Sequence, residues 1–260
     1  MAFENIILEK KEKIGWITIN RPEAMNILSM VTLTEIDSAL DKIHEDENIW
    51  VAVLTSAGTK AFCAGADLKE LSALDLVWNM NYSKTCHRVF KKIEKMGKAF
   101  ICGINGFALG GGFELALACH LRVMSDKAFL ALPELGLGAV PGAGGTQRLT
   151  RIAGKSRALY YILTGDRIDA TTALSMGLVH EIAAPETVIE KCEKLASILC
   201  QKSPFAISLA IQAINSATDI DLENGLNLET ALTAIATASQ DAREGLQAMM
   251  NKRPPSFKGR

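Results

Sequence analysis

Hydrophobic residues recur along the first half of the chain with two spacings, one typical of strands and one typical of helices. Short apolar runs at 6–8, 14–19 and 50–54 predict strands, and the charged turn KKEK joins the first two. Four apolar positions between the second and third runs are three or four residues apart: Leu33, Ile36, Leu40 and Ile43. That spacing places them on one face of a helix.

The same alternation continues to residue 125. Val89, Ile93 and Met96 have helical spacing, and the run AFICGI that follows them predicts a strand. A glycine-rich turn, the short apolar helix ELALAC and the strand LRVMS come next. Strands that alternate with helices predict a sheet covered by helices, and therefore an α/β fold.

The second half of the chain changes character at about Thr187. Only helical patterns follow, at 187–201, 204–217, 222–240 and 241–251. Pro204 suits the first turn of its helix. We therefore predict a core at 1–186 and a helical region at 187–260, which lies either on its own domain or on a neighbouring subunit.

Composition narrows the class of protein. The chain has 260 residues, of which 48% are hydrophobic and 22% are charged, as in ordinary globular domains. A formal net charge of −1 disfavours general binding to nucleic acid or to a membrane surface. The longest apolar run, 99–119, contains Asn105, Glu114 and five glycines, so we expect no membrane span.

Cysteine usage favours a reducing compartment. The six cysteines form no CxxC pair and mostly lie in apolar runs, so we expect them to be reduced and buried. The segment MAFENIILEKKEK does not have the pattern of a secretory signal. Together these features predict a cytoplasmic protein.

Several common site motifs are absent from the sequence. The run GLGAVPGAGG does not match GxGxxG, and Leu149 stands where a P-loop ending at Gly154 to Ser156 requires glycine. There is no GxSxG. The four histidines have no HExxH spacing, so we predict no metal site.

The stretch NGFALGGGFELALAC, 105–119, is the most unusual in the chain. Three glycines, Gly110 to Gly112, separate a strand from an apolar helix that carries Glu114. The first N–H groups of a helix have no partner within it and attract negative charge, so the Gly111 N–H could hold an oxyanion. A second donor could come from the small residues of AFCAGADLKE, 61–70. A tight turn with close helix packing explains either stretch equally well.

Three motifs together resemble the enoyl-CoA hydratase, or crotonase, family. They are AGADLKE (64–70), NGFALGGGFELALAC (105–119) and LPELGLGAVPGAGGTQRL (132–149). NRPEAMN (20–26), LTGDRIDATTALSMGLVHEI (163–182) and MNKRPPSFK (250–258) fit the same family, so the resemblance spans nearly the whole chain. It implies a crotonase-like spiral of strand–strand–helix turns, a C-terminal helical trimerisation region, and a homotrimer or homohexamer.

The resemblance also implies a site for an acyl-CoA thioester. The N–H groups of Ala66 and Gly111 would hold the thioester oxygen, while Glu114 acts mainly as base toward water and Glu134 mainly as acid. Gly142 would add a backbone contact to that water. No separate cofactor is implied, because coenzyme A is part of the substrate. On the residues alone, Glu114 could instead be a helix N-terminal acid and Glu134 a turn acid.

Further positions would contact coenzyme A. The backbones of Ala64, Asp67 and Leu68 match the family's adenine pocket, although we prefer a helix-capping role for the Asp67 side chain. Lys252 matches a position that reaches a coenzyme A phosphate, or is simply solvated surface. The chain has LALPE at 130–134 where familiar short-chain hydratases have FGQPE. That departure leaves open a branched, longer or alicyclic acyl group.

The leading hypothesis is therefore an enoyl-CoA hydratase that adds water across the 2,3 double bond in the degradation of fatty or related acids. A double-bond isomerase commonly keeps one of the two acids, so Glu114 beside Glu134 argues against it. A hydratase for a cyclic dienoyl-CoA stays open. An RNA-binding relative is disfavoured by the neutral charge. A purely structural oligomer has no use for two such acids.

Overall fold

A six-stranded sheet forms the centre of the molecule. The structure is a computed structural model and describes residues 3–72 and 75–260. The strand order is β1-β2-β3-β5-β7-β10. The strands are β1 (Ile6–Lys11), β2 (Ile14–Ile19), β3 (Val51–Ser56), β5 (Ala99–Ile104), β7 (Leu121–Ser125) and β10 (Glu181–Ala183). Neighbours are parallel except β1 and β2, which form an antiparallel hairpin.

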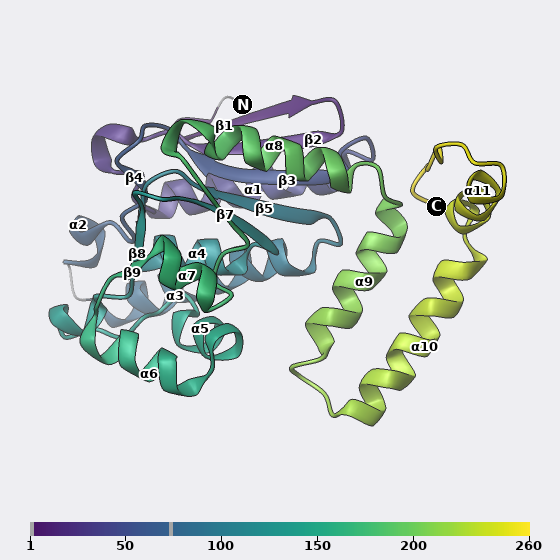
Figure 1. The fold of residues 1–260 in the computed structure, drawn as a ribbon. Coiled ribbons are helices and arrows are strands. Elements are labelled where there is room, and N and C mark those ends of the chain that lie inside the picture. Colours follow the sequence, from purple (N-terminus) through teal and green to yellow (C-terminus); the bar gives the residue numbers. More distant parts are fainter. Residues whose placement is uncertain (1–2, 73–74) are drawn as a thin grey trace.

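Helices cover both faces of this sheet (Figure 1). Ala52 and Leu54 of β3 belong to the core cluster shared with α1 (Met30–Glu45) and α3 (Leu76–Lys95). Val51 and Val53 belong to a second cluster with α8 (Val188–Leu199). Successive side chains of a strand point to opposite faces, so a strand covered on both sides is apolar throughout. That is why the central strands read as continuous apolar runs.

A second, four-stranded sheet lies beside the first, in the order β4-β6-β8-β9. Its strands are β4 (Ala61–Cys63), β6 (Phe107–Leu109), β8 (Phe129–Ala131) and β9 (Ile168–Asp169). β4, β6 and β8 each come directly after a strand of the large sheet, and a helix follows each of them. The predicted α/β fold of strand–strand–helix turns is confirmed.

The remaining short helices lie between the strands in chain order. They are α2 (Leu68–Leu71), α4 (Gly111–Ala118), α5 (Gly145–Ala153), α6 (Lys155–Thr164) and α7 (Ala170–Ser175), with three single 3-10 turns, η1 (Pro22–Ala24), η2 (Glu134–Leu137) and η3 (Pro185–Thr187). The hairpin turn is shorter than predicted: Lys10 and Lys11 pair in β1, and Glu12 makes the turn with a φ of 52°.

The predicted helical C-terminal region is also confirmed. α9 (Pro204–Ser216), α10 (Leu222–Ala238) and α11 (Gln240–Met250) project from the body of the molecule (Figure 1). α8 differs from them, because its buried residues Val188, Cys192 and Ala196 pack on the sheet. The division of the chain at residue 187 stays a prediction. Among the described residues, no helix combines the length and apolar character that a membrane span needs.

Candidate active site

The amino-terminal end of α4 is built on a glycine. Gly110 follows β6 with a φ of 50°, in the left-handed region that residues with side chains seldom adopt. Its N–H donates to the Ala131 carbonyl of β8 at 3.0 Å. A Cβ at Gly110 would lie 3.0 Å from Glu134 Oε1. Glycine at this position therefore lets the Glu134 carboxyl approach the start of α4.

Two backbone N–H groups converge here. Gly111 is the first residue of α4, so its N–H has no partner inside the helix. Around Ala66, Leu28 N–H donates to the Gly65 carbonyl at 2.8 Å and Asp67 N–H donates to the Leu28 carbonyl at 3.4 Å. Within the described ranges, no backbone acceptor is recorded for the Ala66 N–H. A Cβ on Gly111 would lie 3.7 Å from Ala66 N, so both donors border one small space.

Glu114 lies one turn into α4 and is only 2% exposed. Its Oε1 accepts hydrogen bonds from Ala143 N–H at 2.8 Å and Gly145 N–H at 2.6 Å. Gly145 begins α5, so the carboxylate occupies a helix amino terminus, which favours negative charge. Burial raises the pKa of Glu114, while these two N–H groups and the Arg148 charge oppose that rise.

Glu134 begins η2 and faces a different environment. Burial raises its pKa to about 7, and the nearby Glu114 charge adds to the rise. Its Oε2 is buried and has no hydrogen-bond partner among the described residues. The two carboxyls are therefore electrostatic neighbours, one fixed by N–H donors and the other left free to exchange a proton near neutral pH.

The structure thus brings Ala66, Gly111, Glu114 and Glu134 together. Gly142 is adjacent, and its carbonyl accepts from Ser83 Oγ at 2.5 Å; its backbone contact with the reacting water stays a prediction. The N–H groups that reach Glu114 belong to Ala143 and Gly145, which the sequence reasoning missed. The sequence signal for these donors is the glycine-rich run at the start of α5, because the first N–H groups of a helix have no partner within it.

The positions expected to contact coenzyme A are divided between two regions. Ala64 N–H donates to the Met25 carbonyl at 3.0 Å, and Leu68 is 61% exposed. The Asp67 side chain accepts from Lys69 N–H at 2.9 Å as the cap of α2, which confirms the preferred capping role. Lys252 comes shortly after α11, the last helix of the extension, and Figure 1 shows α11 at the far end of the extension from α4. One chain alone therefore does not bring Lys252 to the two glutamates.

The LALPE run, residues 130–134, contributes buried apolar side chains behind the site. Leu130, Ala131 and Leu132 are buried. A Cβ at Gly145 would lie 3.0 Å from both Leu132 Cδ1 and Glu114 Cγ. Leu132 therefore packs against the same backbone that binds Glu114, and the apolar run forms part of the wall behind that carboxylate.

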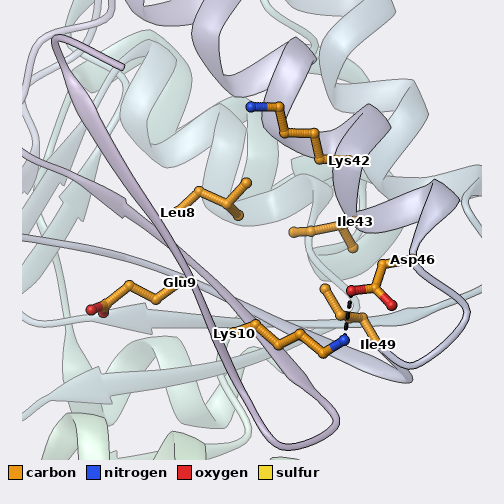
Figure 2. Close-up of a pocket in the computed structure, with 7 residues that line it drawn as sticks. All are labelled: Leu8, Glu9, Lys10, Lys42, Ile43, Asp46 and Ile49. Carbon is orange, nitrogen blue, oxygen red and sulfur yellow. Dashed lines mark hydrogen bonds and ion pairs between the residues drawn. The ribbon is translucent and has the colours of Figure 1, made fainter. Parts of the chain in front are cut away.

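A surface hollow elsewhere carries no such chemistry. It lies between β1 and the end of α1 and is spanned by an ion pair of Lys10 with Asp46 at 2.6 Å (Figure 2). None of the residues that line it belongs to the site around Glu114. In the part of the chain that the structure describes, no three His, Cys, Asp or Glu side chains gather as a metal site would require.

Known proteins share both this sequence and this fold. The enoyl-CoA hydratase/isomerase family model matches residues 9–260. Crotonyl-CoA hydratase of Syntrophomonas wolfei is 38% identical over 99% of both chains. Mitochondrial enoyl-CoA hydratase of Pongo abelii is 40% identical over 98% of this chain and 88% of its own. The crystal structure of enoyl-CoA hydratase from Bacillus anthracis superposes with a TM-score of 0.96 at 38% identity, covering 99% of this chain and 100% of that one. The chain belongs to the enoyl-CoA hydratase/isomerase family.

Proposed function

We propose that the protein is an enoyl-CoA hydratase, which adds water reversibly across the 2,3 double bond of a 2-enoyl-CoA thioester. One observation carries the proposal: two backbone N–H groups that have no backbone acceptor among the described residues border the same site as two carboxyls with different surroundings. The crotonyl-CoA hydratase and mitochondrial enoyl-CoA hydratase among its relatives support the same activity.

The geometry suggests a role for each group. Glu114, ionised by its two N–H donors, takes a proton from water as the water oxygen bonds to the β-carbon. The electrons of the double bond move toward the thioester oxygen, where the Ala66 and Gly111 N–H groups stabilise the enolate. Glu134 then gives its proton to the α-carbon. One proton is taken up by Glu114 and one is lost by Glu134, so transfer between the pair restores the starting state.

The backbone donors carry a large share of the rate enhancement. Removing one oxyanion donor raises the barrier by about 3–4 kcal/mol in other enzymes. Any substitution except proline leaves each N–H in place, which suits a position that must stay constant while the surrounding acyl pocket varies. The two carboxyls then select hydration, since a dedicated double-bond isomerase needs only one of them.

Assembly belongs to the same proposal. We expect a homotrimer or homohexamer, supported by exposed apolar residues on α9–α11. The backbones of Ala64, Asp67 and Leu68 remain the proposed lining of the adenine pocket. Lys252 remains the proposed contact of a coenzyme A phosphate, and its place beyond α11 means that this contact would involve a neighbouring subunit.

A cytoplasmic location completes the proposal. All six cysteines are free thiols, and five of them are buried. Thiols persist in reducing compartments, where disulfides are rare. Fractionation of the producing cell, followed by detection of the intact chain, tests this location directly.

The deciding experiment follows the absorbance of the conjugated enoyl thioester after crotonyl-CoA is mixed with the purified protein. We expect rapid loss of absorbance with the wild type. Glu134→Gln and Glu114→Gln should each lower the rate by about 10²–10⁴-fold, the usual contribution of a general acid or base. Glu47→Gln, at an exposed glutamate beyond α1, is the matched control and should keep wild-type activity.

Two other results would change the assignment. The folded wild type could be inactive on crotonyl-CoA but active on longer, branched or cyclic enoyl thioesters. That result would change the proposed substrate from a short-chain thioester to one of these, as the LALPE run permits. Failure to hydrate any 2-enoyl thioester, combined with double-bond migration in a 3-enoyl-CoA, would replace the hydratase by an isomerase.

A further inference from the structure

The loop that binds Glu114 is itself held from behind by an arginine. Arg148, in the first turns of α5, donates from Nη1 to the Ala143 carbonyl at 2.9 Å. Gly144 has a φ of 107°, and a side chain there would overlap Arg148 Nη1. The guanidinium therefore fills the space beside residues 143–145. Those residues supply both N–H groups that bind Glu114 Oε1.

Arg148 is fixed in turn by Glu94 of α3. Its Nε donates to Glu94 Oε1 at 2.6 Å and its Nη2 to Glu94 Oε2 at 2.8 Å. The pair is largely shielded from solvent, with side-chain exposures of 15% for Arg148 and 30% for Glu94. Two parallel hydrogen bonds fix the plane of a guanidinium as well as its position, which a lysine cannot reproduce.

The backbone of Glu94 is also tied at two points. Its carbonyl accepts from Asn215 Nδ2 of α9 at 2.8 Å and from His120 Nε2 at 3.3 Å. His120 Nδ1 accepts from Phe100 N–H at 3.0 Å, so the ring proton lies on Nε2 and can be donated to Glu94. The end of α3 is therefore anchored both to the turn after α4 and to the helical extension.

We propose that Arg148 and Glu94 are positioning residues for Glu114. Together they hold the 143–145 loop so that its N–H groups aim the carboxylate at the reacting water. This inference rests on the proposed hydratase function. Both residues act through the loop, and Asn215 extends the chain of contacts to α9.

Charge supports the same role for Arg148. The titratable groups that face Glu114 are Arg148 on α5, Tyr82 and Cys86 on α3, and Glu134 on η2. Burial raises the pKa of Tyr82 and raises that of Cys86 to about 12, so both are neutral near pH 7. Arg148 is the cation of this described set. It favours the ionised form of Glu114 that a base requires.

The test compares Arg148→Met, Arg148→Lys and Glu94→Gln with the wild type across pH. We expect Arg148→Met to lower kcat by about 10²-fold, the cost of a displacement of about 1 Å in a catalytic group, with KM near the wild-type value. It should also move the acid limb of kcat/KM to higher pH, because Glu114 then protonates more readily. Arg148→Lys keeps the charge, so its acid limb should stay in place while kcat is still reduced.

Glu94→Gln tests the same pair of residues independently, in case Arg148→Met does not fold. This substitution keeps the Arg148 charge but weakens the two hydrogen bonds between Arg148 and residue 94. We therefore expect kcat to fall, while the acid limb of kcat/KM does not move to higher pH. Arg151→Met is the matched control, since Arg151 lies on the same helix, is about half exposed, and makes a 3.8 Å pair with Asp219 and a 3.3 Å hydrogen bond to the Gln147 side chain, away from the 143–145 loop. We expect wild-type kinetics for this control.

The outcomes separate the two proposals. An active wild type whose folded Arg148→Met and Glu94→Gln variants keep wild-type kcat and pH profile overturns the positioning role alone. Equal losses in Arg151→Met overturn it too, because they would point to general destabilisation of α5. A wild type inactive on every enoyl thioester overturns the hydratase proposal, and the positioning role with it.

Discussion

At the scale of the residue, two identical carboxyl groups acquire different proton affinities from their surroundings. Glu114 receives two N–H groups at the start of α5, which stabilise its charge in spite of burial. Among the described residues, Glu134 Oε2 has no hydrogen-bond partner, and burial raises the pKa of this carboxyl to about 7. A base must be ionised and an acid must be protonated at the working pH, so these surroundings fit the proposed division of the two roles.

The proposed division predicts the same pH dependence of kcat/KM for the two directions of the reaction. Hydration requires protonated Glu134, whose pKa in the free protein is about 7. Above pH 7, kcat/KM for hydration should therefore fall by about tenfold per pH unit. Dehydration of the 3-hydroxyacyl thioester starts from the same pair with its single proton on Glu114, and the overall reaction exchanges no proton with solvent, so its kcat/KM should fall in parallel over the same range. Initial rates in both directions from pH 5 to 9 measure this.

The control for that profile is Glu134→Gln, whose residual rate should lose the limb near pH 7. A wild-type hydration profile that is flat from pH 6 to 9 would contradict the assignment of Glu134 as the acid.

The residues that sequence reasoning found and missed differ in a physical way. Ala66, Gly111, Glu114 and Glu134 lie inside recognisable motifs, and the structure brings them together. The donors to Glu114 depend instead on the conformation of the 143–145 loop, which no spacing encodes. The Glu94–Arg148 pair joins residues 54 positions apart, so only the packing of α3 against α5 reveals it.

At the scale of the element, α4 has opposite electrostatic requirements at its two ends. Its amino terminus presents Gly111 to the site. At its carboxyl terminus, the buried Arg122 side chain donates to the Cys119 carbonyl, to the Ala116 carbonyl at 3.5 Å and to the Leu178 carbonyl at 2.5 Å. A cation there complements the negative end of the helix dipole and pairs the Cys119 and Leu178 carbonyls, while the Ala116 carbonyl also accepts from Cys119 N–H at 3.2 Å.

Arg122→Met should therefore be strongly destabilising. It removes the donor from the buried Cys119 and Leu178 carbonyls, each of which costs about 1–3 kcal/mol when left unpaired. We expect a fall in the free energy of unfolding of about 2–5 kcal/mol, measured by denaturant unfolding under conditions where the chain refolds. Arg157→Met, at an exposed position of α6, serves as the comparison. A loss below about 0.5 kcal/mol, the range of ordinary surface substitutions, would contradict this role.

The hydrophobic pattern predicted the longer strands of the large sheet. It did not predict elements whose existence or place depends on tertiary packing. The strands 14–19, 99–104 and 121–125 agree with β2, β5 and β7 residue for residue. β9 contains two residues, too few to establish a period. An amphipathic pattern also does not show which surface the apolar face of a helix contacts. The sequence therefore could not distinguish α8, which packs on the sheet, from α9–α11, which project from the body of the molecule.

At the scale of the whole molecule, the extension is held in a defined shape but keeps an uncovered apolar surface. Buried Asp241 accepts from Ser203 Oγ at 2.6 Å and from Lys258 N–H at 2.7 Å, which ties the tail to the start of α9. Arg253 pairs with Glu244 and lowers the pKa of that carboxyl to about 2. The exposed large apolar residues of the extension are Ile214, Ile220, Leu222, Leu226, Ile235, Leu246, Met249 and Met250.

Such a surface predicts assembly, because contiguous apolar area on a fixed element is usually covered by a partner. We expect light scattering to give the mass of three or six 28.1 kDa chains. Leu222→Glu combined with Met249→Glu places charges at side chains that are 78% and 79% exposed in the single chain, so the chain should still fold. Burial of those charges between subunits would be costly, and the mass should fall toward one chain.

Asn227→Glu adds the same charge at an exposed polar position of α10 and is the control for that double variant. It should keep the wild-type mass. If Lys252 contacts coenzyme A in a neighbouring subunit, dissociation should also raise KM more than it lowers kcat, because Glu114 and Glu134 lie within one chain. A wild type that is monomeric at micromolar concentration would refute assembly through the extension, and a dissociated double variant with unchanged KM would remove Lys252 from the site.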